Sequence, residues 1–318
     1  MTNTQAQFTG YLTDAHSIEE QALAQLRTAP KIAGTDRLAT AFREHLPETE
    51  GHERAVARLL DGRDESPSWF KDTIMKLGGK GFVLFAWANP DTPGKLLTHA
   101  LSYEALEEAS YIMLGRAAEH LGEEEAVDVA NRIRDEEVAM QGRLAACYDD
   151  AVAASLHAVG NDDLHDQVRR YVADAHALEL QAVELLERAS SPDAGKLAAA
   201  YEEHLAETRD HAETVEARLN ALGGDPSSLK DTAMRMGGIN WALFFEAHPD
   251  TPGKVAVFSY AFEHLEIGGY EQLKRVALRA GDHETALMAE RILEQERAAA
   301  ETIRSLLPNI ALLTLATA

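Results

Sequence analysis

The chain has 318 residues, 45% of them hydrophobic, which is enough for two domains that each bury a core. Its net charge of -23 and pI of about 4.9 argue against a nucleic-acid partner or an anionic membrane surface, because both would repel an acidic protein. The single cysteine, Cys147, excludes an internal disulfide framework, and no stretch is typical of a signal peptide or a membrane span. We therefore expect a soluble, cytoplasmic protein.

Four strongly helical segments follow one another in the first half of the chain, and little there favours a strand. The first carries an apolar stripe over residues 8–26, and the second runs from Asp36 to Leu60. The third begins at about Lys95 and the fourth at about Glu123. Roughly 30 residues connect the second segment to the third, and we interpret them as a helical crossover that covers the bundle.

The same pattern returns after 159 or 160 positions. EHLPETEGH at residues 44–52 becomes EHLAETRDH at 203–211, and PDTPGK occurs at both 90–95 and 249–254. A repeat as long as a domain predicts two tandem domains, residues 1–160 and 161–318, rather than a solenoid. Turn-forming residues at 160–163 mark the predicted joint.

The repeated histidine- and glutamate-rich segment lies in the second helix of each copy. Side chains three, four and seven residues apart share one face of a helix, so His45, Glu48 and His52 are predicted to point the same way. The neighbouring apolar residues fall on that face as well, which predicts that these polar groups enter a core. Buried imidazole and carboxylate groups are costly unless they are hydrogen-bonded or bind a metal.

Further glutamates fall on the apolar stripes of the other helices. We predict that these glutamates bind metal together with the glutamate and the second histidine of the repeated segment. The predicted ligands are Glu19, Glu48, His52, Glu104, Glu107 and Glu137 in the first copy, and Glu179, Glu207, His211, Glu263, Glu266 and Glu296 in the second. Several carboxylates in one core cannot all be ionised without a cation. Carboxylate and imidazole ligands without a thiolate suit a pair of iron or manganese ions, and zinc is compatible with the same set.

This order of residues resembles the ferritin-like di-metal carboxylate superfamily, with one glutamate on the first helix, glutamate and histidine on the second, and glutamates on the third and fourth. More narrowly, the D-x-H-x-x-E start, the HLxETxxH segment and FEHLEIGGY at 262–270 are similar to the bacterial YciE/YciF-type stress-associated proteins. The resemblance implies a four-helix bundle that pairs with a second one, and here both could lie in one chain. It implies the fold more firmly than the reaction.

Two departures from the superfamily pattern predict an asymmetric site. Four residues separate Glu48 from His52, where E-x-x-H is usual, and no histidine follows Glu137 on the fourth helix. The sequence leaves open whether Glu104 and Glu107 both bind metal, and it favours an outer role for His45 and its counterpart His204. For all of these residues the alternative is a hydrogen-bonded core network or partial exposure at the edge of a bundle.

The leading functional hypothesis is an oxygen- or peroxide-reactive oxidase or ferroxidase built on such di-metal sites, acting under stress. The alternative is a structural or partner-binding protein with a structural metal or none, and metal storage is a third possibility. The expected partners are metal ions, with the two bundles pairing inside the chain and a homo-oligomer compatible with the sequence. The apolar C-terminal residues 308–318 are expected to dock on the bundle or on a neighbour.

Overall fold

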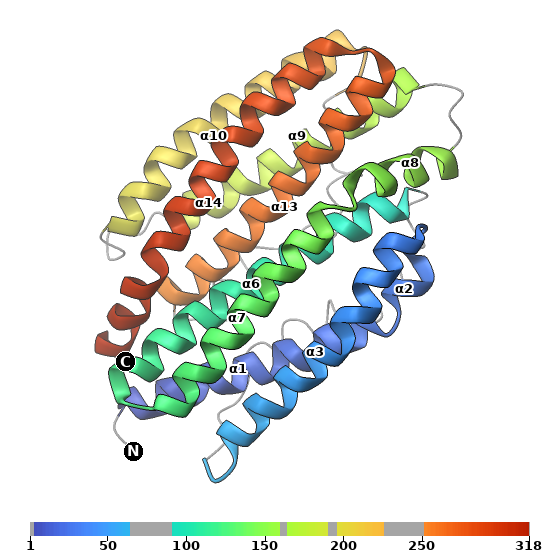
Figure 1. Cartoon of the computed structure of the whole chain (residues 1–318). Helices are drawn as coiled ribbons and strands as arrows, with labels where there is room; N and C mark the ends of the chain where they lie inside the picture. The colour runs from blue at the N-terminus through green and yellow to red at the C-terminus, as the bar shows by residue number, and fades with distance from the viewer. Residues whose placement is uncertain (1–2, 64–90, 160–163, 190–195, 226–250, 318) are drawn as a thin grey trace.

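The computed structural model describes residues 3–63, 91–159, 164–189, 196–225 and 251–317, and within them every regular element is a helix. In chain order these helices are α1 (Asn3–Leu26), α2 (Ala29–Ile32), α3 (Asp36–Leu60), α6 (Thr92–Leu121), α7 (Glu124–Ala145), α8 (Tyr148–Val159), α9 (Leu164–Ala189), α10 (Lys196–Ala221), α13 (Thr251–Ala280) and α14 (His283–Thr317). The first bundle contains α1, α3, α6 and α7, and the second contains α9, α10, α13 and α14 (Figure 1). The predicted all-α fold of two tandem bundles is confirmed. The predicted crossovers and the joint at 160–163 lie outside the described residues.

Local signals in the sequence account for the ends of these helices. The side chain of Thr35 caps α3 by accepting a hydrogen bond from the backbone N–H of Leu38 at 3.2 Å. Gly122, with a φ of 71°, ends α6, and the next N–H reaches back to the carbonyl of Ala118 at 3.0 Å. Gly281 makes the equivalent turn between α13 and α14 with a φ of 74°. Both turns reverse the chain sharply, so α7 packs against α6, and α14 packs against α13.

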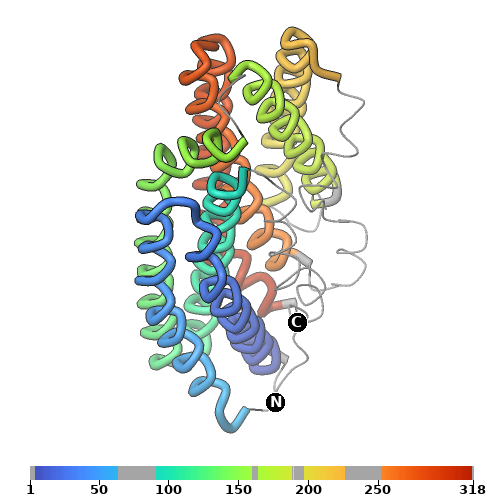
Figure 2. Tube along the Cα trace, turned by 90° about the vertical axis from the view of Figure 1, so that its right-hand side faces the viewer, coloured from blue at the N-terminus to red at the C-terminus, as the bar shows by residue number. Residues whose placement is uncertain are grey.

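The two bundles pack side by side, with α6 and α13 in contact between them (Figure 2). One hydrophobic cluster crosses the junction, because Ala105, Ala109 and Met113 of α6 belong to the main core of the second bundle. Polar contacts accompany it: Ser102 Oγ donates to the carbonyl of Ala261 at 2.7 Å. The two bundles therefore pack into one continuous body rather than two separate domains.

The repeated PDTPGK motif helps to build this junction. Lys95 at the start of α6 forms ion pairs with Asp91 at 3.3 Å and with Asp174 of α9 at 3.1 Å. The backbone of Gly94 accepts a hydrogen bond from Gln272 of α13 at 2.8 Å, and a Cβ at Gly94 would come within 2.5 Å of the same side chain. Residues 91–95 therefore form a close-packed start of α6 against the second bundle.

Both bundles also extend a helix toward the other. The short α8 follows α7 and packs against α13 of the second bundle as well as α6. At the other end, the apolar C-terminal residues form the last turns of α14, and Leu315 lies in a cluster with Phe8, Leu12 and Tyr111 of the first bundle. The tail therefore docks on the first bundle, and the start of α1 and the end of α14 lie at the same end of the molecule (Figure 1). Among the described helices, none combines the length and apolar character that crossing a bilayer requires.

Candidate metal centre

The core carboxylates lie within apolar stripes whose members are three or four residues apart. In α1, Glu19 lies between Ala15 and Ala22 in such a stripe, and all three side chains are buried. In α7, Glu137 has the same relation to the buried Ile133 and Met140. The periodicity that builds a four-helix core therefore also carries the carboxylates into it.

The stripe of α3 contains both histidines of the repeated segment. Its buried members are Leu38, Phe42, His45, Thr49, His52, Val56 and Leu59. This spacing alternates steps of four and three residues, and Thr49 rather than Glu48 occupies the middle position. As a result His45 and His52 enter the core together, seven residues apart, whereas Glu48 lies on the flank of the helix.

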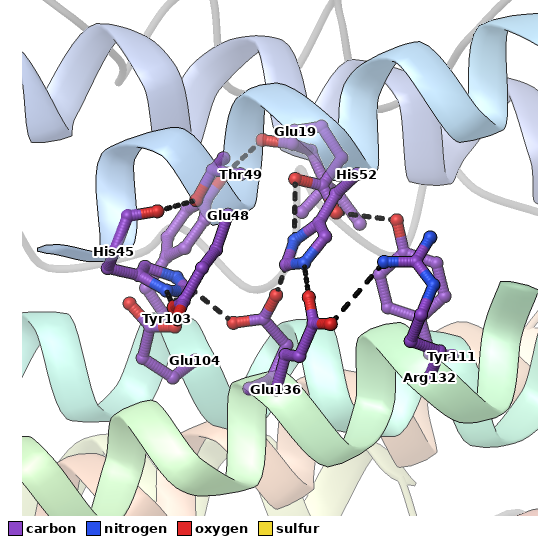
Figure 3. A network of polar contacts seen from close by, with 12 residues as sticks. Glu19, His45, Glu48, Thr49, His52, Tyr103, Glu104, Tyr111, Arg132 and Glu136 are labelled. Atoms are coloured by element: carbon purple, nitrogen blue, oxygen red, sulfur yellow. Dashed lines mark hydrogen bonds and ion pairs between the residues drawn. The ribbon is translucent and has the colours of Figure 1, made fainter.

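In the first bundle these side chains converge from all four helices (Figure 3). Two groups of ligand atoms, each within 4.8 Å of one another, consist of Glu19, His52 and Glu137, and of His45, Glu104 and Glu137. Glu137 belongs to both groups: one oxygen lies 2.9 Å from His52 Nδ1, and the other lies 3.2 Å from His45 Nε2. A carboxylate shared in this way could be a ligand of either of two neighbouring ions.

The second bundle repeats the arrangement residue for residue. Its two groups are Glu179, His211 and Glu296, and His204, Glu263 and Glu296. The distance from His211 Nδ1 to Glu296 is again 2.9 Å, and His204 Nε2 lies 3.0 Å from Glu263. All five side chains are buried. The chain therefore contains two copies of one histidine–carboxylate cluster.

Glu107 of α6 and its counterpart Glu266 of α13 lie near the other carboxylates, although neither belongs to the groups of ligand atoms described above. Both side chains are buried, and neither oxygen of either carboxyl group has a hydrogen-bond partner among the described residues. Burial, followed by repulsion from Glu137, Glu19 and Glu104, raises the pKa of Glu107 well above its ordinary value. Glu107 thus faces the other carboxylates, in a position where only a proton or a cation can compensate its charge.

The structure places the other predicted residues outside these groups. Glu48 and Glu207 have side chains that are 34% and 42% exposed, in contrast to the predicted core-facing position. Glu48 instead receives a hydrogen bond from Arg143 and contacts Nδ1 of His45 at 2.8 Å. The histidine that sequence reasoning assigned to an outer role thus lies inside the cluster, and the glutamate lies behind it. The recognisable signal is the position of Thr49 in the buried stripe, which moves Glu48 off the core face.

Other polar residues near the cluster support the buried carboxylates. The hydroxyl of Tyr111 donates a hydrogen bond to Glu19 at 2.5 Å, and Tyr270 makes the same bond to Glu179. His16 lies away from the cluster, where its Nε2 is 3.0 Å from Glu53. The two tyrosines therefore fix the orientation of the α1 and α9 glutamates.

Sequence reasoning missed one partner of the first cluster altogether. Glu136 of α7, next to Glu137, lies 2.5 Å from Nε2 of His52 (Figure 3). Its side chain is 34% exposed, so it does not belong to the apolar stripe from which the other candidates were selected. Only the packing of α7 against α3 reveals the contact.

Protons balance the charges of the first cluster when no cation is bound. Burial disfavours a charged imidazole, but Glu104 and Glu137 outweigh it and raise the pKa of His45 to about 11. Burial opposes the charge of His52 as well, but Glu137 and Glu19 raise its pKa to about 10. Burial raises the pKa of Glu104 to about 8 in spite of the opposing effect of His45. The pKa of Glu137 is lowered, because its bonds to the two histidines outweigh its burial.

These residues fit a pair of divalent metal ions. The buried atoms without a hydrogen-bond partner among the described residues include an oxygen of Glu19, both oxygens of Glu137 and Nδ1 of His52, and the second bundle repeats all of them. The histidine and glutamate atoms lie close together without forming regular hydrogen bonds, and such a convergence of buried imidazole and carboxylate atoms is typical of a metal site. Each cluster offers four carboxylates and two imidazoles, which suits two ions such as iron, manganese or zinc.

The family assignment agrees with this architecture. The family described as domain of unknown function DUF892 matches the chain twice, over residues 3–157 and 163–316. The chain therefore belongs to this family in two tandem copies, and the family is part of the ferritin-like superfamily. No solved structure matches the chain.

Proposed function

We propose that each bundle holds a two-metal carboxylate centre that reacts with oxygen or peroxide, with iron as the leading metal and manganese as the next. The main support is the pair of equivalent clusters in which a buried glutamate is shared by two histidine–carboxylate groups. Hydrogen bonding inside a core needs no such concentration of carboxylates, and their burial is costly without a cation. An assignment to the stress-associated YciE/YciF type rests on sequence resemblance.

The roles of the side chains follow from their positions. In the first bundle Glu19 and His52 would hold one ion, His45 and Glu104 the other, and Glu137 both; Glu107 faces the two positions. Loading requires that the protons on the histidines and the protonated carboxyl groups leave the core. Tyr111 holds Glu19 in place through its hydroxyl hydrogen bond. When bound, a pair of ferrous ions would supply two electrons, which with two protons are enough to reduce hydrogen peroxide to two water molecules.

A small cavity beside the first cluster supports the proposal that the reactant is a small molecule. Its volume is about 20 Å³, and the residues that line it include Phe42, Leu96, Tyr103 and Glu104. This volume holds about one water-sized molecule. Its largely apolar lining suits a small uncharged oxidant.

A non-catalytic role is the second candidate, and one observation favours it. The histidines and carboxylates already compensate one another's charge through protonation, so the folded core does not depend on a metal for neutrality. Under this hypothesis the protein would act as a structural or partner-binding bundle.

Metal content separates the two candidates. We expect about four iron or manganese ions per chain in protein purified without chelators from supplemented cells, as two-metal sites in both bundles require. Glu137→Gln and Glu296→Gln should each remove the ions of one bundle and about half of the peroxide consumption. Glu125→Gln and Glu294→Gln, which change exposed positions on the same helices, are the matched controls. Folded protein that neither contains nor takes up metal would reject the proposal and favour the non-catalytic role.

A further inference from the structure

The two clusters have the same inner residues but different partners behind their histidines. At the first position, Nε2 of His52 lies 2.5 Å from a carboxylate oxygen of Glu136. At the equivalent position, Nε2 of His211 lies 3.2 Å from the amide oxygen of Gln295. Both histidines are fully buried and turn Nδ1 toward the shared glutamate of their cluster. The bundles thus differ in the charge and the distance of this acceptor.

The second histidine of each cluster shows a difference in the same direction. Nδ1 of His45 lies 2.8 Å from Glu48, and Arg143 binds both oxygens of that carboxylate. In the second bundle the distance from His204 to Glu207 is 3.5 Å. Thr302 replaces the arginine there, and its hydroxyl donates to the carbonyl of Ala298 instead. In the first bundle an arginine therefore holds the outer glutamate in place, whereas the second bundle has a threonine at the equivalent position.

An acceptor behind a histidine affects the metal in front of it. A carboxylate draws the imidazole proton toward itself, which makes the opposite nitrogen a stronger donor and fixes the ring and its tautomer. A neutral amide at a longer distance does this less. The negative charge of Glu136 also favours a cation nearby, and Arg132 offsets it only weakly, because that arginine is half-exposed and 3.4 Å away (Figure 3). Arg143 neutralises much of the charge of Glu48, so Glu136 carries the larger share of the difference.

We infer that the two centres are not equivalent: the centre of the first bundle binds divalent metal more tightly than that of the second, and Glu136 is the positioning residue that makes the difference. Removal of such an outer partner typically costs about 10- to 100-fold in metal affinity. The first centre therefore fills before the second when metal is scarce. The same stronger donors hold iron in the oxidised state more firmly in the first bundle. This inference rests on the proposed function.

A metal titration of the full-length chain tests the inference without an activity assay. Chelator-treated protein is titrated with Co²⁺ against a competing chelator, and the visible absorption of bound cobalt reports occupancy. We expect two classes of sites of equal number whose affinities differ by about 10- to 100-fold. Glu137→Gln should remove the tight class and Glu296→Gln the weak class, which assigns each class to its bundle.

Two reciprocal substitutions identify the residue responsible. Glu136→Gln gives the first centre the acceptor of the second and should merge the two classes at the weaker affinity. Gln295→Glu does the reverse and should strengthen the weak class by about the same factor. The exposed Glu125→Gln is the control and should leave both classes unchanged.

The results separate this inference from the proposed function. A single affinity class in the wild-type protein, or two classes that persist unchanged in both reciprocal variants, would overturn the inference while the two metal centres stand. A chain that binds no cobalt, iron or manganese would overturn both. If Glu136→Gln fails to fold, Gln295→Glu alone decides, because an unchanged weak class in that variant contradicts the role of the acceptor charge.

Discussion

At the scale of the residue, the protonation of the buried clusters links metal binding to stability. A glutamate titrates near 4.5 in the unfolded chain, whereas burial raises the pKa of Glu104 to about 8 and that of Glu263 to about 7. At pH values between 4.5 and these raised pKa values, the folded metal-free protein binds more protons than the unfolded chain. The stabilising contribution of these carboxyl groups is therefore complete below about pH 4.5 and is lost as the pH rises through 7 and 8.

His45 acts in the same direction over a higher range. The pKa of His45 rises from 6.5 in the unfolded chain to about 11, so its contribution is present below 6.5 and decreases above it. We therefore predict that the melting temperature of the metal-free protein falls between about pH 5 and pH 9. Calorimetry at several pH values measures this, and Glu104→Gln should flatten the slope, because it removes one of the titrating groups. A slope that this variant leaves unaltered would contradict the assignment.

At the scale of the element, the sequence predicts the helices well because the same apolar spacing determines both periodicity and packing. The second predicted helix, Asp36–Leu60, has the bounds of α3, and the glutamates of α1, α6 and α7 enter the core where their stripes place them. Glu48 shows the limit of this reasoning. On a helix Glu48 lies only about 60° from His45 around the axis, so both residues fall on one broad face. That they share this face does not by itself decide which of them enters the core. The buried stripe of α3 decides it, because its steps of four and three residues pass through His45, Thr49 and His52 and leave Glu48 on the flank.

Contacts between elements cannot be predicted from the periodicity of a single helix, because they depend on how the helices cross. Glu136 lies on the flank of α7 and becomes a partner of His52 only through the crossing of α7 and α3. The C-terminal tail is another case, because its apolar residues predict a docked segment without naming the surface. The structure shows that surface to be the first bundle, because Leu315 belongs to the same hydrophobic cluster as Phe8 and Tyr111.

The tail supports a prediction about the stability of the first bundle. Leu315 is buried in the same hydrophobic cluster as Tyr111, whose hydroxyl holds Glu19. Leu315→Ala should lower the free energy of unfolding by about 2–5 kcal/mol, as the truncation of a buried leucine side chain generally does. Urea unfolding measures the change, and Leu287→Ala on the exposed face of the same helix, where the side chain is 72% exposed, is the control. Equal effects of the two substitutions would show that the tail contributes no packing to the first bundle.

At the scale of the whole molecule, the tandem chain forms a pair of bundles that share a core. The hydrophobic cluster of the second bundle extends into α6 and α8 of the first, and α14 returns to cover the other end. Polar groups are paired at this junction too: Glu108 of α6 accepts hydrogen bonds from Tyr260 at 2.9 Å and from Arg304 at 2.7 Å. Most of the contacts that hold the bundles together are therefore independent of the peptide that links them.

This arrangement predicts that the halves remain associated when the chain is cut at the proposed domain boundary between residues 160 and 161. A protease site inserted there should give two fragments that migrate together in size-exclusion chromatography and separate only in denaturant, because the shared core resembles that of an obligate dimer. Lys95→Ala should weaken the association, since it leaves Asp91 and Asp174 without the lysine that pairs with both, and breaking a largely buried ion pair costs about 3–5 kcal/mol. Arg116→Ala, which changes a more exposed ion pair on the same helix, should leave the association unchanged. Fragments of the wild-type sequence that separate in native buffer would show that the linking peptide, and not the shared core, holds the two bundles together.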